Sequence, residues 1–133
     1  MAQDSRGSIF AALAPNKWVN LFTLNEYKGD AFYQHQLLKF SLFHEGGANS
    51  ANAIVAIQEA ADDGDGNPVA WTTAYQHATQ IVPGGREFIS YYHTKPHVRV
   101  LVFSTATGRV MGTWLPEESQ ALPSFADDAT AAL

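Results

Sequence analysis

The chain has 133 residues, no cysteine and a formal net charge of −5, and only 16 % of its residues are charged. This length predicts a single domain that can bury a hydrophobic core without help from disulfides or metal ions. The lack of cysteine excludes disulfides, thiolate metal sites and cysteine nucleophiles. A mildly acidic chain without clustered Lys or Arg is a poor partner for nucleic acid, and no apolar run is long enough to span a membrane.

Residues 1–17 are expected to form an N-terminal arm or a short helix. Their apolar patch is too short for a signal peptide and lacks its charged leading segment, and a Pro-Asn-Lys sequence separates it from the first expected strand. That strand covers residues 18–24, which are rich in β-branched and aromatic side chains. Residues 31–36 are compatible with either a strand or a helical turn.

Alternation of apolar and polar side chains predicts a half-buried strand over residues 36–43. After a glycine-containing loop, residues 53–75 indicate a hairpin. A β-rich run enters the turn Asp62-Asp-Gly-Asp-Gly-Asn-Pro68 and returns as a second β-rich run opened by Trp71. Asp, Gly and Asn favour such turns because they tolerate positive φ angles or hydrogen-bond their own backbone.

Further β segments lie in the second half of the chain. The stretch 77–82 is a short candidate strand stopped by a Pro-Gly-Gly turn. Longer strands are expected at residues 87–92, 98–103 and 109–115. Valines occupy one face of the middle strand, and Leu101 and Phe103 make its other face apolar too, which predicts a central position in a sheet.

Seven to eight short strands separated by turns predict an all-β fold, an antiparallel β-sandwich of jelly-roll or Ig-like type. The predicted β-sandwich domain covers residues 18–115. It is flanked by the N-terminal arm and by an acidic, alanine-rich C-terminal arm over residues 116–133.

The hairpin turn is the first candidate ligand site. Asp63, Asp65 and Asn67 offer oxygen atoms at alternate positions, as the first half of a calcium loop does. The pattern then departs, because the sixth position is Pro68 instead of Gly and the twelfth is Ala74 instead of Glu. A solvated hairpin turn is the alternative, and calcium is the one cofactor for which the sequence offers a candidate site.

Catalytic patterns are missing from the sequence. No serine lies in a Gly-x-Ser-x-Gly elbow, and nothing singles out Glu45, Glu59 or Glu87 as an acid–base pair. The histidines lack metal-ligand spacing, since His93 and His97 flank a proline break, and we interpret all five as surface and loop residues. We expect no enzymatic activity.

Tyr91 and Tyr92 form the second candidate site. Neighbouring residues of a strand face opposite sides, so one ring is expected to face solvent. An exposed tyrosine can stack on a sugar or anchor a protein interface. The alternative places one ring in the core and the other over a sheet edge.

Four stretches carry a further pattern: residues 54–71, Val82-Pro-Gly-Gly85, Lys95-Pro-His-Val-Arg-Val-Leu-Val102 and Gly112-Thr-Trp114. Together they resemble small β-sandwich virion proteins of tailed bacteriophages. The resemblance implies a non-enzymatic structural subunit, either a capsid decoration or cement protein or a tail or fibre component. Such a subunit is made in the host cytoplasm and located in the virion.

The resemblance also implies the partners. These are copies of the chain itself, forming a homo-oligomer, and other virion proteins, contacted through the arms and edge strands. The alternative function is a carbohydrate-binding β-sandwich module with a glycan as ligand. Neither nucleic acid nor a membrane is an expected partner.

Overall fold

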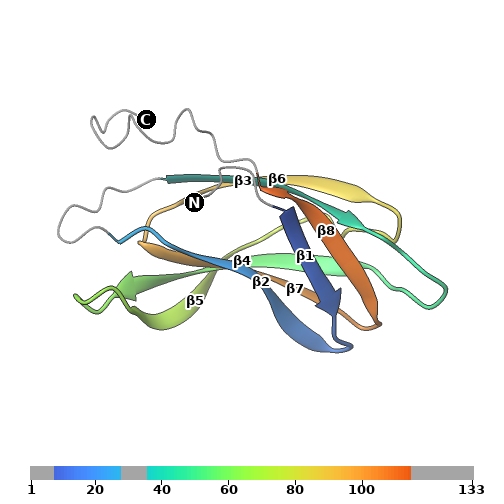
Figure 1. Cartoon of the computed structure of the whole chain (residues 1–133), viewed down its shortest axis with the longest axis horizontal. Coiled ribbons are helices and arrows are strands. Elements are labelled where there is room, and N and C mark those ends of the chain that lie inside the picture. Colours follow the sequence, from blue (N-terminus) through green and yellow to red (C-terminus); the bar gives the residue numbers. More distant parts are fainter. Residues whose placement is uncertain (1–7, 28–35, 115–133) are drawn as a thin grey trace.

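The structure is a computed structural model that describes residues 8–27 and 36–114. Its strands form two four-stranded sheets, β1-β8-β3-β6 and β2-β7-β4-β5, which pack face to face (Figure 1). Every strand pairing is antiparallel. The predicted all-β antiparallel sandwich of seven to eight strands is therefore confirmed. The strands are β1 (Ser8–Leu13), β2 (Lys17–Asn25), β3 (Gln36–His44), β4 (Ala53–Asp62), β5 (Pro68–Gln76), β6 (Arg86–His93), β7 (His97–Ser104) and β8 (Gly108–Trp114).

The pairing is that of one long hairpin rolled into a sandwich. β4 pairs with β5 at the central turn, and outward from it β3 pairs with β6, β2 with β7, and β1 with β8. Two further pairings, β3 with β8 and β4 with β7, close the roll. This order is a jelly roll, which settles the topology that the sequence left open between jelly-roll and Ig-like.

The core lies between the two sheets and follows the alternation of the sequence. Val98, Val100 and Val102 point inward from β7 and are fully buried. β7 lies between β2 and β4, which confirms the prediction of a central strand. On the opposite sheet, Leu38, Phe40 and Leu42 alternate along β3 and fill the same layer, because successive side chains of a strand face opposite sides.

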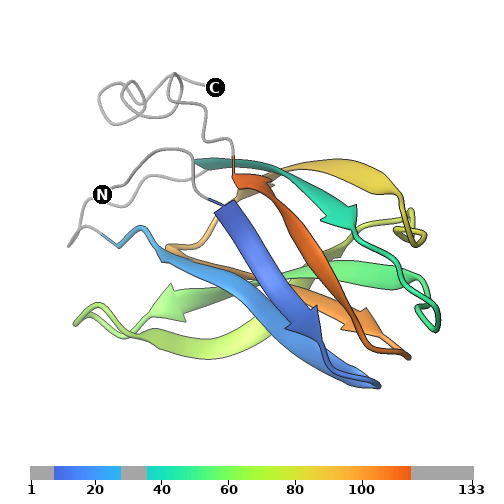
Figure 2. The same ribbon diagram turned by 45° about the vertical axis from the view of Figure 1, so that its right-hand side comes forward.

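One strand lies where an arm was expected. β1 falls inside the predicted N-terminal arm 1–17, yet all six of its residues pair with β8, and the two strands lie side by side in Figure 2. Leu13 at its end is buried in the core. The segment is too short to show a period by itself, and its partner strand lies about a hundred residues further along the chain. The predicted C-terminal arm, 116–133, lies outside the described residues.

The short strand expected over residues 77–82 is wrong. Only a single bridge, between Ile81 and Ala53, forms in this stretch. The Ile81 side chain is nonetheless buried in the core, so this apolar residue packs in the core without being part of a strand.

The described part of the chain contains no helix long and apolar enough to cross a membrane.

Candidate functional site

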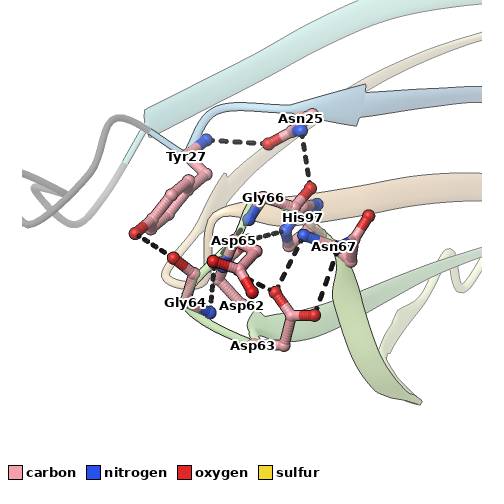
Figure 3. Close-up of polar contacts among 9 residues, drawn as sticks. All are labelled: Asn25, Tyr27, Asp62, Asp63, Gly64, Asp65, Gly66, Asn67 and His97. Atoms are coloured by element: carbon pink, nitrogen blue, oxygen red, sulfur yellow. Dashed lines mark hydrogen bonds and ion pairs between the residues drawn. The ribbon is translucent and has the colours of Figure 1, made fainter.

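The turn between β4 and β5 holds the residues considered for calcium (Figure 3). The Asp63 carboxylate accepts hydrogen bonds from the backbone N–H groups of Asp65, at 2.7 Å, and Asn67, at 3.2 Å. It also accepts one from Asn67 Nδ2 at 3.2 Å. These hydrogen bonds lower the pKa of Asp63. The carboxylate therefore organises the turn itself, as in the alternative interpretation of a solvated hairpin turn.

No three His, Asp or Glu side chains within residues 8–27 and 36–114 are grouped to hold a metal ion. The asparagine amide turns its nitrogen toward the Asp63 carboxylate, so these two side chains do not aim their oxygens at one point. Calcium binding at Asp63, Asp65 and Asn67 stays a prediction.

Asp62 joins the same turn to β7. Its carboxylate accepts hydrogen bonds from the N–H groups of Gly64, at 2.6 Å, and Gly66, at 3.0 Å, and contacts Nε2 of the buried His97 at 2.6 Å. Burial raises the pKa of Asp62, but the His97 and backbone hydrogen bonds outweigh it, and the pKa lies below its ordinary value. The side chains of Asn25 and Tyr27 donate to the carbonyls of Gly66 and Gly64 (Figure 3).

Tyr91 points inward to a buried carboxylate. Glu59 on β4 is 3 % exposed. It accepts hydrogen bonds from the Tyr91 hydroxyl on β6 and from the backbone N–H groups of Thr94 and Lys95, both at 2.9 Å. Burial, together with the Glu59 carboxylate, raises the pKa of Tyr91. Glu59 had nothing to single it out in the sequence, because its partners lie more than thirty residues away.

The contact continues along the open side of the sandwich. The rings of Tyr91 and Tyr75 stack between the edge strands β6 and β5, with centroids 5.2 Å apart. The Tyr75 hydroxyl lies 3.0 Å from Nδ1 of His77, and Nε2 of His77 lies 2.8 Å from Glu87 on β6. We call these four residues, together with Glu59, the edge seam. It ties two edge strands of different sheets together.

Three histidines are buried, so the interpretation of all five as surface and loop residues is wrong. His44, His93 and His97 are each at most 2 % exposed. Nε2 of His44 lies 2.8 Å from the carbonyl oxygen of Ala51, and Nδ1 of His93 lies 2.8 Å from that of Lys95. Burial of a polar ring is tolerated when it is hydrogen-bonded, and the partners come from loops that the sequence pattern does not place.

Tyr92 faces the opposite way from Tyr91 and is 54 % exposed, which confirms that one ring of the pair faces solvent. It lies on the outer face of the β1-β8-β3-β6 sheet. On this face a row crosses all four strands, from Phe10 through Met111 and Phe43 to Arg86. Phe88, on the same strand as Tyr92, is 70 % exposed. We call Phe10, Phe43, Phe88, Tyr92 and Met111 the aromatic face.

Comparison with known proteins supports the fold alone. No family model and no curated protein matches the sequence. Among solved structures the chain is similar to one described as the crystal structure of PirA. The TM-score is 0.56 at 12 % identity, covering 86 % of this chain and 96 % of that chain. It is also similar to a chain from the structure of infectious bursal disease virus, Gx strain, with a TM-score of 0.38 at 9 % identity, covering 89 % of this chain and 32 % of that chain.

The likeness to PirA is a likeness of fold, since so few residues are shared. It agrees with the β-sandwich and adds nothing to the bacteriophage resemblance of the sequence.

Proposed function

We propose that this protein is a non-enzymatic structural subunit that assembles with copies of itself through the aromatic face, as a capsid decoration or tail component of a phage virion does. The observation that carries the proposal is the exposure of Phe88, Tyr92 and Phe10, at 70 %, 54 % and 56 %, beside Phe43 and Met111. Monomeric soluble proteins rarely leave large contiguous apolar patches in water, and such patches mark interaction sites.

The charges of this face favour a head-to-tail contact. Arg86 and Arg109 lie over the rings of Phe43 and Phe10. Arg109 is paired with Glu45, at 2.9 Å, whereas Arg86 donates to the neutral Ser41 hydroxyl and leaves positive charge on this face of a chain of net charge −5. Two copies of this face would repel each other, whereas a different, acidic surface of a neighbour attracts it. Head-to-tail contacts build rings or open arrays.

The non-enzymatic part of the proposal is supported by how the buried carboxylates are used. Glu59 and Asp62 accept several hydrogen bonds each from the backbone and from Tyr91 or His97. Those bonds close the edge seam and the β4–β5 turn, so neither carboxylate is presented to a substrate.

Light scattering after size exclusion tests the assembly. We expect the intact chain to form a defined oligomer, and Phe88→Ser to reduce its mass to that of a monomer with an unchanged circular dichroism spectrum. The matched control is Val69→Ser, which removes an exposed apolar side chain, 46 % exposed, from the other sheet. An intact chain that stays monomeric at all concentrations, or an oligomer indifferent to Phe88→Ser, refutes the proposal.

A carbohydrate-binding module is the second candidate function. Tyr91 cannot serve as its platform in the observed arrangement, because its ring stacks on Tyr75 and its hydroxyl is bound to Glu59. Tyr92 remains an exposed ring. A more specific observation in favour of this function is a neutral pocket on the opposite sheet.

A further inference from the structure

A pocket of about 440 Å³ opens on the outer face of the β2-β7-β4-β5 sheet. This volume falls within the range of small-molecule sites, roughly 300–1,000 Å³. It is lined by loop and strand residues that are far apart in the sequence, namely Ala51, Asn52, Ile54, Gln80, Phe103, Ser104 and Thr105. None of these side chains is ionisable, so the pocket suits an uncharged ligand.

One wall of the pocket is apolar and continues into an exposed indole. Phe103 on β7 pairs in register with Ile54 on β4 and with Trp18 on β2, so the three lie in one row on the outer face. The Trp18 and Phe103 ring centroids are 5.2 Å apart, and Trp18 is 46 % exposed. A platform of this kind covers the apolar side of a flat ligand while leaving its edge in water.

The other side of the pocket carries paired amides. Asn52 Nδ2 donates to Gln80 Oε1 at 3.0 Å. Each amide has two N–H donors and an oxygen acceptor. Within the described residues, the Asn52 oxygen and the Gln80 nitrogen have no further hydrogen-bond partner. The Ser104 hydroxyl donates to the carbonyls of Ala51 and Asn52, which fixes the loop that presents the amide.

We infer that this pocket binds a neutral saccharide. A sugar ring has an apolar C–H side, which suits Phe103 and Trp18, and a rim of hydroxyl groups that both donate and accept, which suits Asn52 and Gln80. The inference rests on the second candidate function, carbohydrate binding, and places the binding site on the β2-β7-β4-β5 sheet instead of at the tyrosines of β6. It is independent of the assembly proposed for the aromatic face.

A glycan array probed with the labelled intact chain tests the inference, followed by titration of the best glycan by isothermal titration calorimetry, which does not depend on Trp18. We expect binding to neutral glycans, a loss of at least tenfold in affinity for Gln80→Ala, and a similar loss for Trp18→Ala. The control Val69→Ser, an exposed side chain on β5 that does not line the pocket, should bind as the intact chain does, and Tyr92→Ala is compared as the alternative platform on the opposite sheet.

Three outcomes overturn the inference: no glycan bound, a preference for acidic glycans, or binding that depends on Tyr92 and not on Gln80. Gln80 is exposed in a loop, so its variant is expected to fold, and circular dichroism checks this. Light scattering of the same variants reports assembly separately, so failure of one proposal is distinguishable from failure of the other.

Discussion

The contribution of the edge seam to folding stability can be tested with two adjacent tyrosines, because Tyr91 contacts a buried carboxylate whereas Tyr92 is exposed. Tyr91→Phe removes only the hydroxyl that donates to the buried Glu59 carboxylate. Hydrogen bonds to charged groups contribute about 1.5–3 kcal/mol to stability. Tyr91 is only partly buried, so we expect a loss of about 2 kcal/mol, toward the lower part of that range.

Urea unfolding followed by tryptophan fluorescence measures this loss, since the chain has three tryptophans. With a urea slope of about 1–3 kcal/mol per molar, the midpoint should fall by about 1 M. Tyr92→Phe removes the same atom from an exposed ring and should change stability by less than about 0.5 kcal/mol. Equal losses from the two variants would refute the reasoning.

Glu59→Leu extends the test by removing the shared acceptor. It leaves the N–H groups of Thr94 and Lys95 without their carboxylate partner, and we expect a loss of about 3–5 kcal/mol, since each buried donor left without a partner costs about 1–3 kcal/mol. In that background Tyr91→Phe should cost little more, since its partner is already gone. Full additivity of the two losses would show that the hydroxyl acts through another contact.

Two further predictions concern backbone packing and pH. Gly112→Ala places a Cβ atom 1.8 Å from the backbone oxygen of Ser41, so we expect the free energy of unfolding to fall by more than about 4 kcal/mol, or the chain not to fold. The control Thr113→Ala, at the exposed neighbouring residue, should fold normally. A Gly112→Ala variant that is as stable as the intact chain in thermal unfolding would contradict this. Burial lowers the pKa of His93 below its usual 6.5, so the unfolded chain takes up the proton at higher pH than the folded chain. Stability should therefore fall as pH drops below about 6.5. His93→Gln should flatten that fall in urea midpoints, and an unchanged slope would refute the assignment.

The sequence predicted most of the strands well because the signals of a strand are local. Alternation placed β3 within a residue of its observed ends, and the Asp-Gly turn placed the β4–β5 hairpin, although β5 begins at Pro68, three residues before the expected Trp71. β1 was missed because six residues show no clear period and its evidence is a partner strand at the other end of the chain. Ile81 was misassigned because an apolar residue can be buried from a loop as well as from a strand.

The candidate sites were less accessible to sequence reasoning. The strand period predicts that Tyr91 and Tyr92 face opposite sides. It does not predict the contact of Tyr91 with Glu59, because Glu59 lies on a strand of the other sheet. The pocket beside Phe103 joins loops before β4 and β6 to the end of β7. No local motif marks such a site, because its residues meet only when the sandwich closes.

The rolled hairpin also bears on the order in which a growing chain can fold. β4 and β5 meet early, but β8 lies between β1 and β3 in its sheet, so this sheet stays split in two until β8 has left the ribosome. Until then β1 lacks its partner strand, and the edge of β3 that pairs with β8 stays open. Pairings this distant in sequence form slowly, and partly folded chains with open strand edges aggregate readily. The growing chain therefore passes through a period of vulnerability before β8 emerges, in which stalled or truncated chains are natural targets for chaperones.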